Sequence, residues 1–326
     1  MLLVVYSHVI HFGYGPLFTE SGKSFNTVIG AFFMQLFFFI CGFVTLKDNL
    51  FFTPLNTLHF LKAKFQALII PAIFFGCLYL YLFNIPLRPL LLSETKGGYW
   101  FTLSLFQFYL FFSLFMLLLK NLTQAKLNMI LISLSFVLYA ISTPKISIDF
   151  FNINADFVKI IGVVQWRFFP FFIAGILVRK SYTHLENLLK NSYISGGIIT
   201  LFFCSAICGT LYPSLKNGAN YHVYFLLIGS SGSMLFFQYF HKYSSSIMMY
   251  KYFSHIGLYT LEIYLLHYFF LPRNLQFIGN FFIDSPSLVL EMFVSMIIAI
   301  LVIIVCLATS SFIKVSDRLG QLLFGR

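Results

Sequence analysis

Two histidines in an apolar run near the start of the chain are the first candidates for chemistry. His8 and His11 lie in LLVVYSHVIHFG. In an α-helix a spacing of three residues places two side chains about 60° apart, so both can face one cavity. A buried imidazole is held in its neutral form and can accept a proton. The alternative is that His8 only hydrogen-bonds a neighbouring helix, and spacing alone does not decide between the two.

The position of His8 favours a catalytic role over a metal site. The run breaks at Gly13 and Pro16, which puts His8 roughly 8 to 12 Å inside the helix end at 1.5 Å per residue. No further His or carboxylate nearby has the spacing of metal ligands, so we expect no metal.

A second pair of ionisable residues occurs in the apolar run YTLEIYLLHYFF. Glu262 and His267 are separated by five residues, about 140° around a helix, so they do not form a local dyad. An ionised Glu262 within a membrane needs a partner, and we expect a Lys, Arg or His across the bundle. For His267 we expect a hydrogen bond to another helix.

Basic residues precede a third apolar run. Lys62 and Lys64 lie with His59 in HFLKAKFQALIIP. One interpretation is that they anchor a helix end at the membrane surface. The other is that they bind the phosphates of an anionic donor that arrives from the cytosol.

These residues belong to a chain whose composition is that of a polytopic membrane protein. The chain has 326 residues, of which 59% are hydrophobic and 10% charged. We predict an all-α bundle of about ten spanning helices that forms one membrane-embedded domain over residues 1–326. The predicted spans are 1–15, 27–46, 66–84, 100–119, 127–143, 161–178, 193–212, 221–240, 256–272 and 288–313.

The distribution of charge indicates topology rather than nucleic-acid binding. The net charge is +11, but the basic residues are spread over the loops without a basic face, so no nucleic acid is expected. Thirteen of the 21 Lys and Arg residues fall on one side of the predicted spans. The positive-inside rule places that side, with both chain ends, in the cytosol of a multi-pass cell-membrane protein. The first segment is too short for a full span, and we expect the true start to lie upstream of Met1.

Six segments, in order, resemble the integral membrane acyltransferases of acyltransferase family three. LLVVYSHVIHFG resembles the family's first helix, with the catalytic His at His8. MQLFFFICGFV resembles the second, with Cys41 in place of the usual Ser. GGYWFTLSLFQFY resembles the fourth, with Trp100 in the family's Trp-Phe-Leu position. The other three resemble the third, sixth and ninth helices: FLKAKFQALIIPAIFF, FFPFFIAGILVRK and SHIGLYTLEIYLLHYFF.

The sequence departs from the family in two places. The family usually carries an Arg about ten residues before the catalytic His, which here would precede Met1. The basic pair of the third helix is usually spaced three apart, whereas Ala67 occupies the second place after Lys64.

The resemblance implies acyl transfer with acetyl-CoA as the expected donor. The expected acceptor is a hydroxyl of a cell-surface glycan or its precursor, with the lipid bilayer as the surroundings. His8 would be the general base. The candidate substrate-binding residues are Lys62, Lys64, His11, Trp100, Glu262 and His267.

Two other functions remain open at this point. A transporter or flippase of glycan precursors would also be polytopic and could use His8 as a proton relay, although no internal repeat is visible. An inactive structural homologue is the third possibility, because the upstream Arg is absent.

Overall fold

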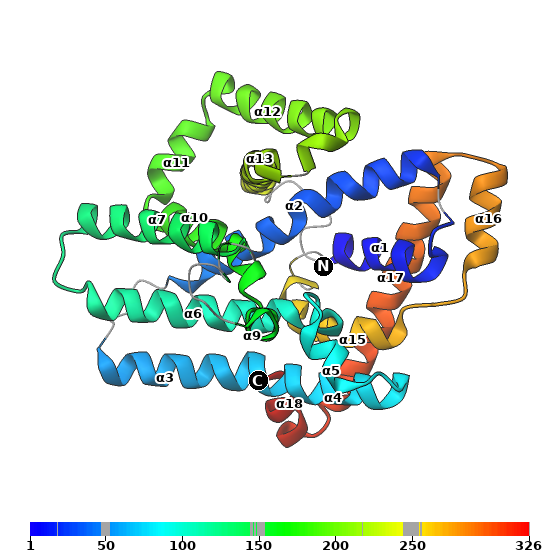
Figure 1. Cartoon of the computed structure of the whole chain (residues 1–326), viewed down its shortest axis with the longest axis horizontal. Coiled ribbons are helices and arrows are strands. Elements are labelled where there is room, and N and C mark those ends of the chain that lie inside the picture. The colour runs from blue at the N-terminus through cyan, green and yellow to red at the C-terminus, as the bar shows by residue number, and fades with distance from the viewer. Residues whose placement is uncertain are drawn as a thin grey trace. The chain divides into compact units, whose positions relative to one another are not determined.

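Over the residues that the computed structural model describes, all the regular secondary structure is helical (Figure 1). Those residues are 1–17, 19–46, 53–143, 146, 148, 154–216, 218–243, 254 and 256–325. Four residues that entered the count of basic residues, Lys47, Lys145, Lys251 and Arg326, lie outside them. The prediction of an all-α bundle is confirmed.

Seven described helical segments are long and apolar enough to cross a membrane. They are α2 (Glu20–Thr45), the continuous run of α3 (Pro54–Lys64), η2 (Phe65–Ile69) and α4 (Ile70–Phe83), α6 (Trp100–Leu118), α7 (Gln124–Ile141), α12 (Ser192–Leu211), α13 (Gly218–Tyr243) and α17 (Leu288–Ile313). A pair of helices bent by 49°, α9 (Ala155–Ile161) and the run of η4 (Val163–Phe168) and α10 (Phe169–Lys180), makes an eighth span when it is counted as one segment. These eight correspond to eight of the ten predicted spans.

The other two predicted spans form short helices. The first is α1 (Leu2–His8), which continues as the π-helix η1 (Val9–Tyr14). The second is α15 (Thr260–Phe270), with 11 residues. The remaining helices are α5 (Leu87–Leu92), η3 (Lys96–Gly98), α11 (Tyr182–Leu189), η5 (Pro213–Lys216), α16 (Gln276–Asp284) and α18 (Asp317–Phe324).

The third span begins 12 residues earlier than predicted. Thr53 caps α3 by accepting a hydrogen bond from the backbone N–H of Asn56, and Pro54 occupies the first helical position, where its missing N–H costs nothing. Pro71 would break an ordinary helix, but it follows the π-helix η2, whose wider turns accommodate the lost hydrogen bond.

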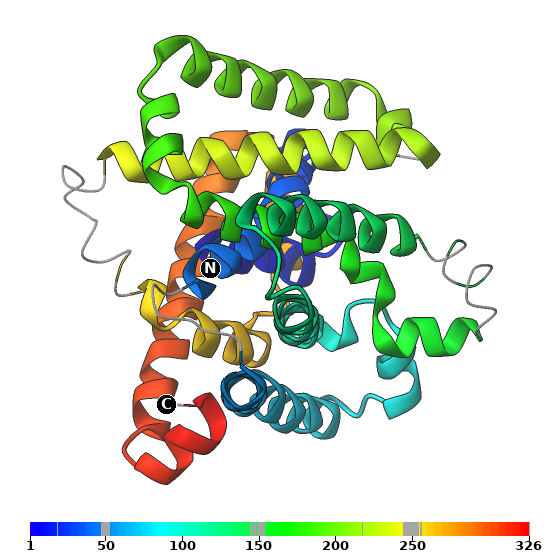
Figure 2. The same ribbon diagram turned by 90° about the vertical axis from the view of Figure 1, so that its left-hand side faces the viewer.

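The chain divides into two compact units, and each is described by itself. Unit 1 comprises residues 1–37 and 183–312, and unit 2 comprises residues 38–182 and 313–326. In unit 1, α12 packs against α13 (Figure 2), and the side chain of Tyr224 fills the space beside Gly209. Phe32 of α2 joins Phe202 and Ile228 in the core of this unit.

The core of unit 2 is aromatic, and two glycines allow its helices to approach closely. The ring of Phe38 contacts those of Phe108 and Phe168. A Cβ on Gly42 would lie 1.9 Å from the carbonyl oxygen of Phe172, and one on Gly175 would lie 2.0 Å from that of Phe39. Small residues at such crossings permit the close backbone packing that holds membrane helices together.

Candidate active site

His8 lies in unit 1 at the point where α1 changes into the π-helix η1. π-Turns often mark functional sites, because the extra residue displaces the side chains around it. The end of η1 is tied to the segment after α15: the carbonyl of Gly13 accepts a 3.1 Å hydrogen bond from the N–H of Leu275. A Cβ on Gly13 would lie 3.3 Å from the carbonyl oxygen of Pro272. This junction holds α1 beside α15.

Two residues of α15 surround the imidazole of His8. Nε2 of His8 lies 3.0 Å from the hydroxyl of Tyr268, at hydrogen-bond distance. The ring of His267 stacks on that of His8, with centroids 5.3 Å apart and an interplanar angle of 28°. The ring of Phe12 contacts both, with its centroid 5.7 Å from that of His8 and 6.1 Å from that of Tyr268. The sequence predicted His8 and His267 as site residues, and the structure brings them together.

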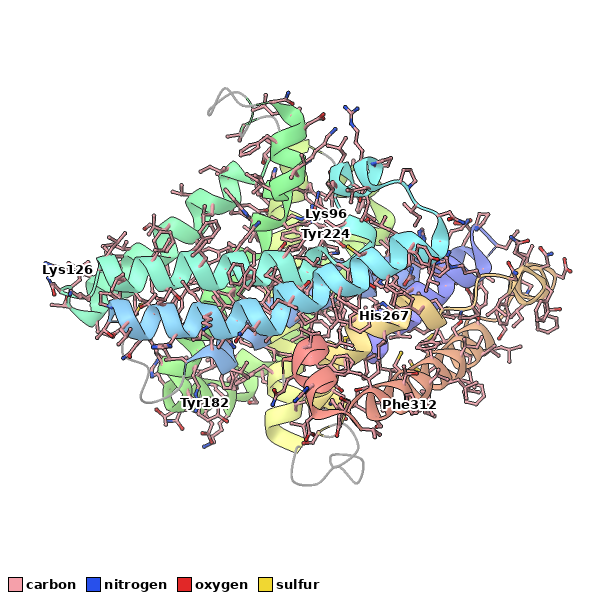
Figure 3. The ribbon with its side chains drawn as sticks, turned by 90° about the horizontal axis from the view of Figure 1, so that it is seen from below. Lys96, Lys126, Tyr182, Tyr224, His267 and Phe312 are labelled. Carbon is pink, nitrogen blue, oxygen red and sulfur yellow. The ribbon has the colours of Figure 1, made fainter. Side chains whose placement is uncertain are left out.

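The tautomer of neutral His267 is determined by its own helix. Its Nδ1 lies 3.0 Å from the carbonyl oxygen of Ile263, and a carbonyl can only accept, so Nδ1 carries the hydrogen. Nε2 of the neutral ring therefore has a free lone pair. This atom is buried and has no hydrogen-bond partner among the described residues. Figure 3 shows where His267 lies on α15.

The other two candidates of unit 1 lie apart from this contact. Glu262 is buried on α15 and accepts a 2.7 Å hydrogen bond from the hydroxyl of Ser310 on α17. The hydroxyl of Ser310 is therefore one partner of this buried carboxylate, and the partner expected from the sequence, a Lys, Arg or His, stays a prediction. His11 is exposed, and its ring packs edge-on against Phe12 at 5.2 Å.

A buried carboxylate in α17 was missed by the sequence analysis. Glu291 is fully buried, and its Oε2 accepts a 2.5 Å hydrogen bond from the hydroxyl of Thr19. Thr19 Oγ1 also accepts from the N–H of Gly22, so it caps the start of α2. A Cβ on Gly22 would lie 2.2 Å from Glu291 Oε1. The available signal was a carboxylate in the apolar run LVLEMFVSMII, close to a predicted helix start.

Tyr268 was missed because nothing in the sequence distinguishes it from the other aromatic residues of its run. Tyrosine hydroxyls are common at membrane interfaces, and the chain has 19 of them. Only the packing of α15 against α1, 260 positions away, gives this hydroxyl its contact with His8.

The candidate donor site belongs to unit 2, where the two lysines have different surroundings. Lys62 is exposed. Lys64 is half-buried, with its ammonium 4.6 Å from the ring centroid of Tyr109 and 5.4 Å from that of Phe60. Two residues turn a helix by about 200°, so the two side chains leave α3 on opposite faces.

Trp100 also lies in unit 2, as the first residue of α6. Its ring stacks on that of Phe168 at 5.5 Å and contacts Phe38 at 6.1 Å. It therefore belongs to the aromatic core of this unit.

A buried lysine in unit 2 has a structural role that the sequence did not suggest. Lys96 is 6% exposed, and its ammonium donates hydrogen bonds to the carbonyls of Leu91 and, at 2.7 Å, Lys159. These carbonyls lie in the last turns of α5 and α9, where unpaired carbonyl oxygens attract a cation. Burial lowers the pKa of Lys96, and the nearby Glu94 partly opposes this change.

The chain was compared with known protein families, curated proteins and solved structures. Residues 1–310 match the model of the acyltransferase family 3 domain. The chain belongs to this family. It is therefore a membrane acyltransferase, which agrees with the resemblance seen in the sequence, and the family domain extends over residues of both units. No curated protein and no solved structure matches the chain.

Proposed function

We propose that this acyltransferase moves an acetyl or other short acyl group from acyl-CoA to a hydroxyl of a cell-surface glycan or its precursor. Acetyl-CoA is the expected donor. Family membership supports acyl transfer, and the observation that carries the assignment of the base is the contact of His8 with Tyr268 and His267.

In the proposed reaction His8 acts as the general base. In this proposal the Nε2–H of His8 donates to the hydroxyl of Tyr268, 3.0 Å away, and Nδ1 is the nitrogen that takes the proton. The acceptor oxygen attacks the thioester carbonyl as its proton passes to His8. When the tetrahedral intermediate collapses, the carbon–sulfur bond breaks, and the CoA thiolate leaves and receives the proton from His8.

Lys62 supports a cytosolic docking site for the donor more directly than Lys64 does. Its side chain is exposed, so its ammonium can reach a phosphate, whereas the ammonium of Lys64 lies over two aromatic rings. The excess of basic residues on one side supports the orientation with that side and both chain ends in the cytosol.

The test is release of the CoA thiol by the purified protein in lipid nanodiscs. With acetyl-CoA and an alcohol acceptor, the wild-type protein should release thiol and form the ester. His8→Ala should reduce turnover by about two to four orders of magnitude, the usual contribution of a positioned base. His184→Ala is the matched control, because this histidine is exposed on α11.

The result separates the proposal from a transporter that uses His8 as a proton relay. A transporter would leave the thioester intact in every variant. Ester formation by His8→Ala at the wild-type rate would remove His8 from the mechanism.

A further inference from the structure

The candidate active site contains histidine nitrogens that can accept hydrogen bonds, and a ligand that binds there must supply the donors. In His267 the backbone of Ile263 fixes Nε2 of the neutral ring as an acceptor, and Nε2 is buried with no partner among the described residues. A buried polar atom without a partner loses its hydrogen bond to water and gains nothing in return. Such an atom in a native protein calls for a ligand or a water molecule.

His8 faces the same requirement. Its ring stacks on that of His267 at 5.3 Å, and the proposed reaction leaves Nδ1 of His8 unprotonated. The two stacked imidazoles then present two acceptor nitrogens within one site. A monohydric alcohol brings a single hydroxyl hydrogen and can satisfy only one of them.

We propose that His267 is a specificity-determining residue, which binds a second hydroxyl of the acceptor. The hydroxyl that reacts donates to His8, and a second hydroxyl donates to Nε2 of His267. This inference rests on the proposed function, which it deepens by naming the residue that recognises a second hydroxyl of the acceptor. Sites built to hydrogen-bond a substrate hydroxyl discriminate strongly against analogues that lack it, because a buried partner is then left unpaired.

Phe12 lies beside the two histidines. Its half-buried ring contacts His8 and Tyr268 and belongs to the π-helix η1.

The first test compares two acceptors of nearly equal size, ethylene glycol and 1-propanol, with acetyl-CoA and the whole protein in nanodiscs. The wild-type protein should acylate the diol at least about tenfold faster, the effect of one neutral hydrogen bond to a buried partner. His267→Asn should abolish this preference, because asparagine retains a donor toward Ile263 but has no counterpart of Nε2. His267→Gln places an amide oxygen near the position of Nε2 and should retain part of the preference.

A second readout does not depend on turnover. In the protein labelled with ¹⁵N-histidine, the Nε2 resonance of His267 is assigned by its loss in His267→Asn. Ethylene glycol should shift this resonance, and 1-propanol at the same concentration should leave it in place. A resonance that does not respond to the diol overturns the proposal, whether or not either alcohol is acylated.

The outcomes distinguish a failure of the diol inference from a failure of the proposed acyl transfer. Equal acylation of both alcohols by the wild-type protein, or a preference that survives in His267→Asn, overturns the diol inference and leaves acyl transfer standing. A diol-specific shift of His267 without ester formation supports the binding site and contradicts the proposed reaction. If His267→Asn does not fold, the resonance is assigned with His267→Gln and the titration decides.

Discussion

The hydroxyl of Tyr268 lies 3.0 Å from Nε2 of His8, although 260 positions separate the two residues in the chain. α15 therefore supplies the group that orients the histidine of α1. The junction of Gly13 with Pro272 and Leu275 holds the two helices in place for this contact. Hydrogen bonds of this kind choose which ring nitrogen of a histidine is free to react.

Tyr268→Phe should reduce kcat by about tenfold and leave KM for the acyl donor unchanged. The variant keeps the ring, which packs 5.1 Å from His8, and removes only the hydroxyl whose neutral hydrogen bond is worth about 1 kcal/mol. Steady-state kinetics check this split, and ¹⁵N spectra of His8 should show a loss of tautomer preference. Tyr193→Phe is the control, because Tyr193 is 89% exposed. A variant with wild-type kcat would show that the hydroxyl does not position the base.

Gly22→Ala should destabilise the protein by about 1 to 3 kcal/mol, the usual cost of overpacking. The new methyl group would meet Glu291 Oε1 at 2.2 Å. Gly196→Ala in α12 meets nothing within 4 Å and should be neutral or stabilising, because alanine favours a helix over glycine. Reversible unfolding in mixed micelles measures both variants.

A double mutant identifies the cause of this destabilisation. Glu291→Ala makes room for the methyl group, so the loss in Gly22→Ala/Glu291→Ala should be smaller than the sum of the two single losses by about 1 kcal/mol or more. Additive losses would mean that the introduced methyl group and the Glu291 carboxylate do not compete for the same space.

Lys62→Ala and Lys64→Ala should have different effects. Lys62 is exposed, so its loss should raise KM for acetyl-CoA at low salt and leave the stability unchanged. Lys64 lies 4.6 Å from the ring of Tyr109, so its loss should lower the melting temperature. Lys126→Ala, an exposed residue at the start of α7, serves as the control for net charge (Figure 3). Equal KM values for acetyl-CoA in the wild-type protein and Lys62→Ala would show that Lys62 does not bind the donor and only anchors the helix at the membrane.

Lys96→Met should destabilise the protein by about 1 to 3 kcal/mol. The substitution keeps an unbranched side chain but leaves the carbonyls of Leu91 and Lys159 without their donor. Lys120→Met, at an exposed position, removes the same charge without these hydrogen bonds. Equal unfolding free energies for the two variants would contradict the role of Lys96 in joining α5 to α9.

A reporter fused to the C-terminus should give a cytosolic signal. Thirteen of the 21 basic residues fall on the side of the predicted chain ends, and such a bias retains loops in the cytosol. Paired fusions of alkaline phosphatase and green fluorescent protein measure this. Phosphatase activity outside the cell would reverse the orientation proposed for donor binding.

The helices were predictable because hydrophobic length is the dominant signal in a membrane protein. All ten predicted spans contain a helix among the described residues; seven of them reach a spanning length, and an eighth does so if the bent pair of α9 and α10 counts as one span. Hydropathy could not show that a helix begins in a polar segment before its apolar residues. The polar segment before Phe65 reads as a loop by hydropathy, yet Thr53 and Pro54 begin a helix there.

The site was predictable only as a set of separate residues. His8 and His267 were visible because ionisable groups are rare in apolar runs. Their stacking depends on the junction at Gly13, which involves backbone atoms that no side-chain pattern encodes. Lys62 and Lys64 were expected to act together because they are neighbours in the sequence, and the geometry of the helix separates them.

At the crossing of α2 and α10 in unit 2, each helix has a glycine where the backbone of the other comes closest. Gly42 leaves space for the carbonyl of Phe172, and Gly175 leaves space for that of Phe39. A side chain at either position would clash with the backbone of the other helix, so we expect both glycines to be retained. The same interlock resists sliding, because a shift of one residue along either axis brings a residue with a side chain to the point of closest approach. We therefore expect this crossing to stay fixed when other parts of the unit move.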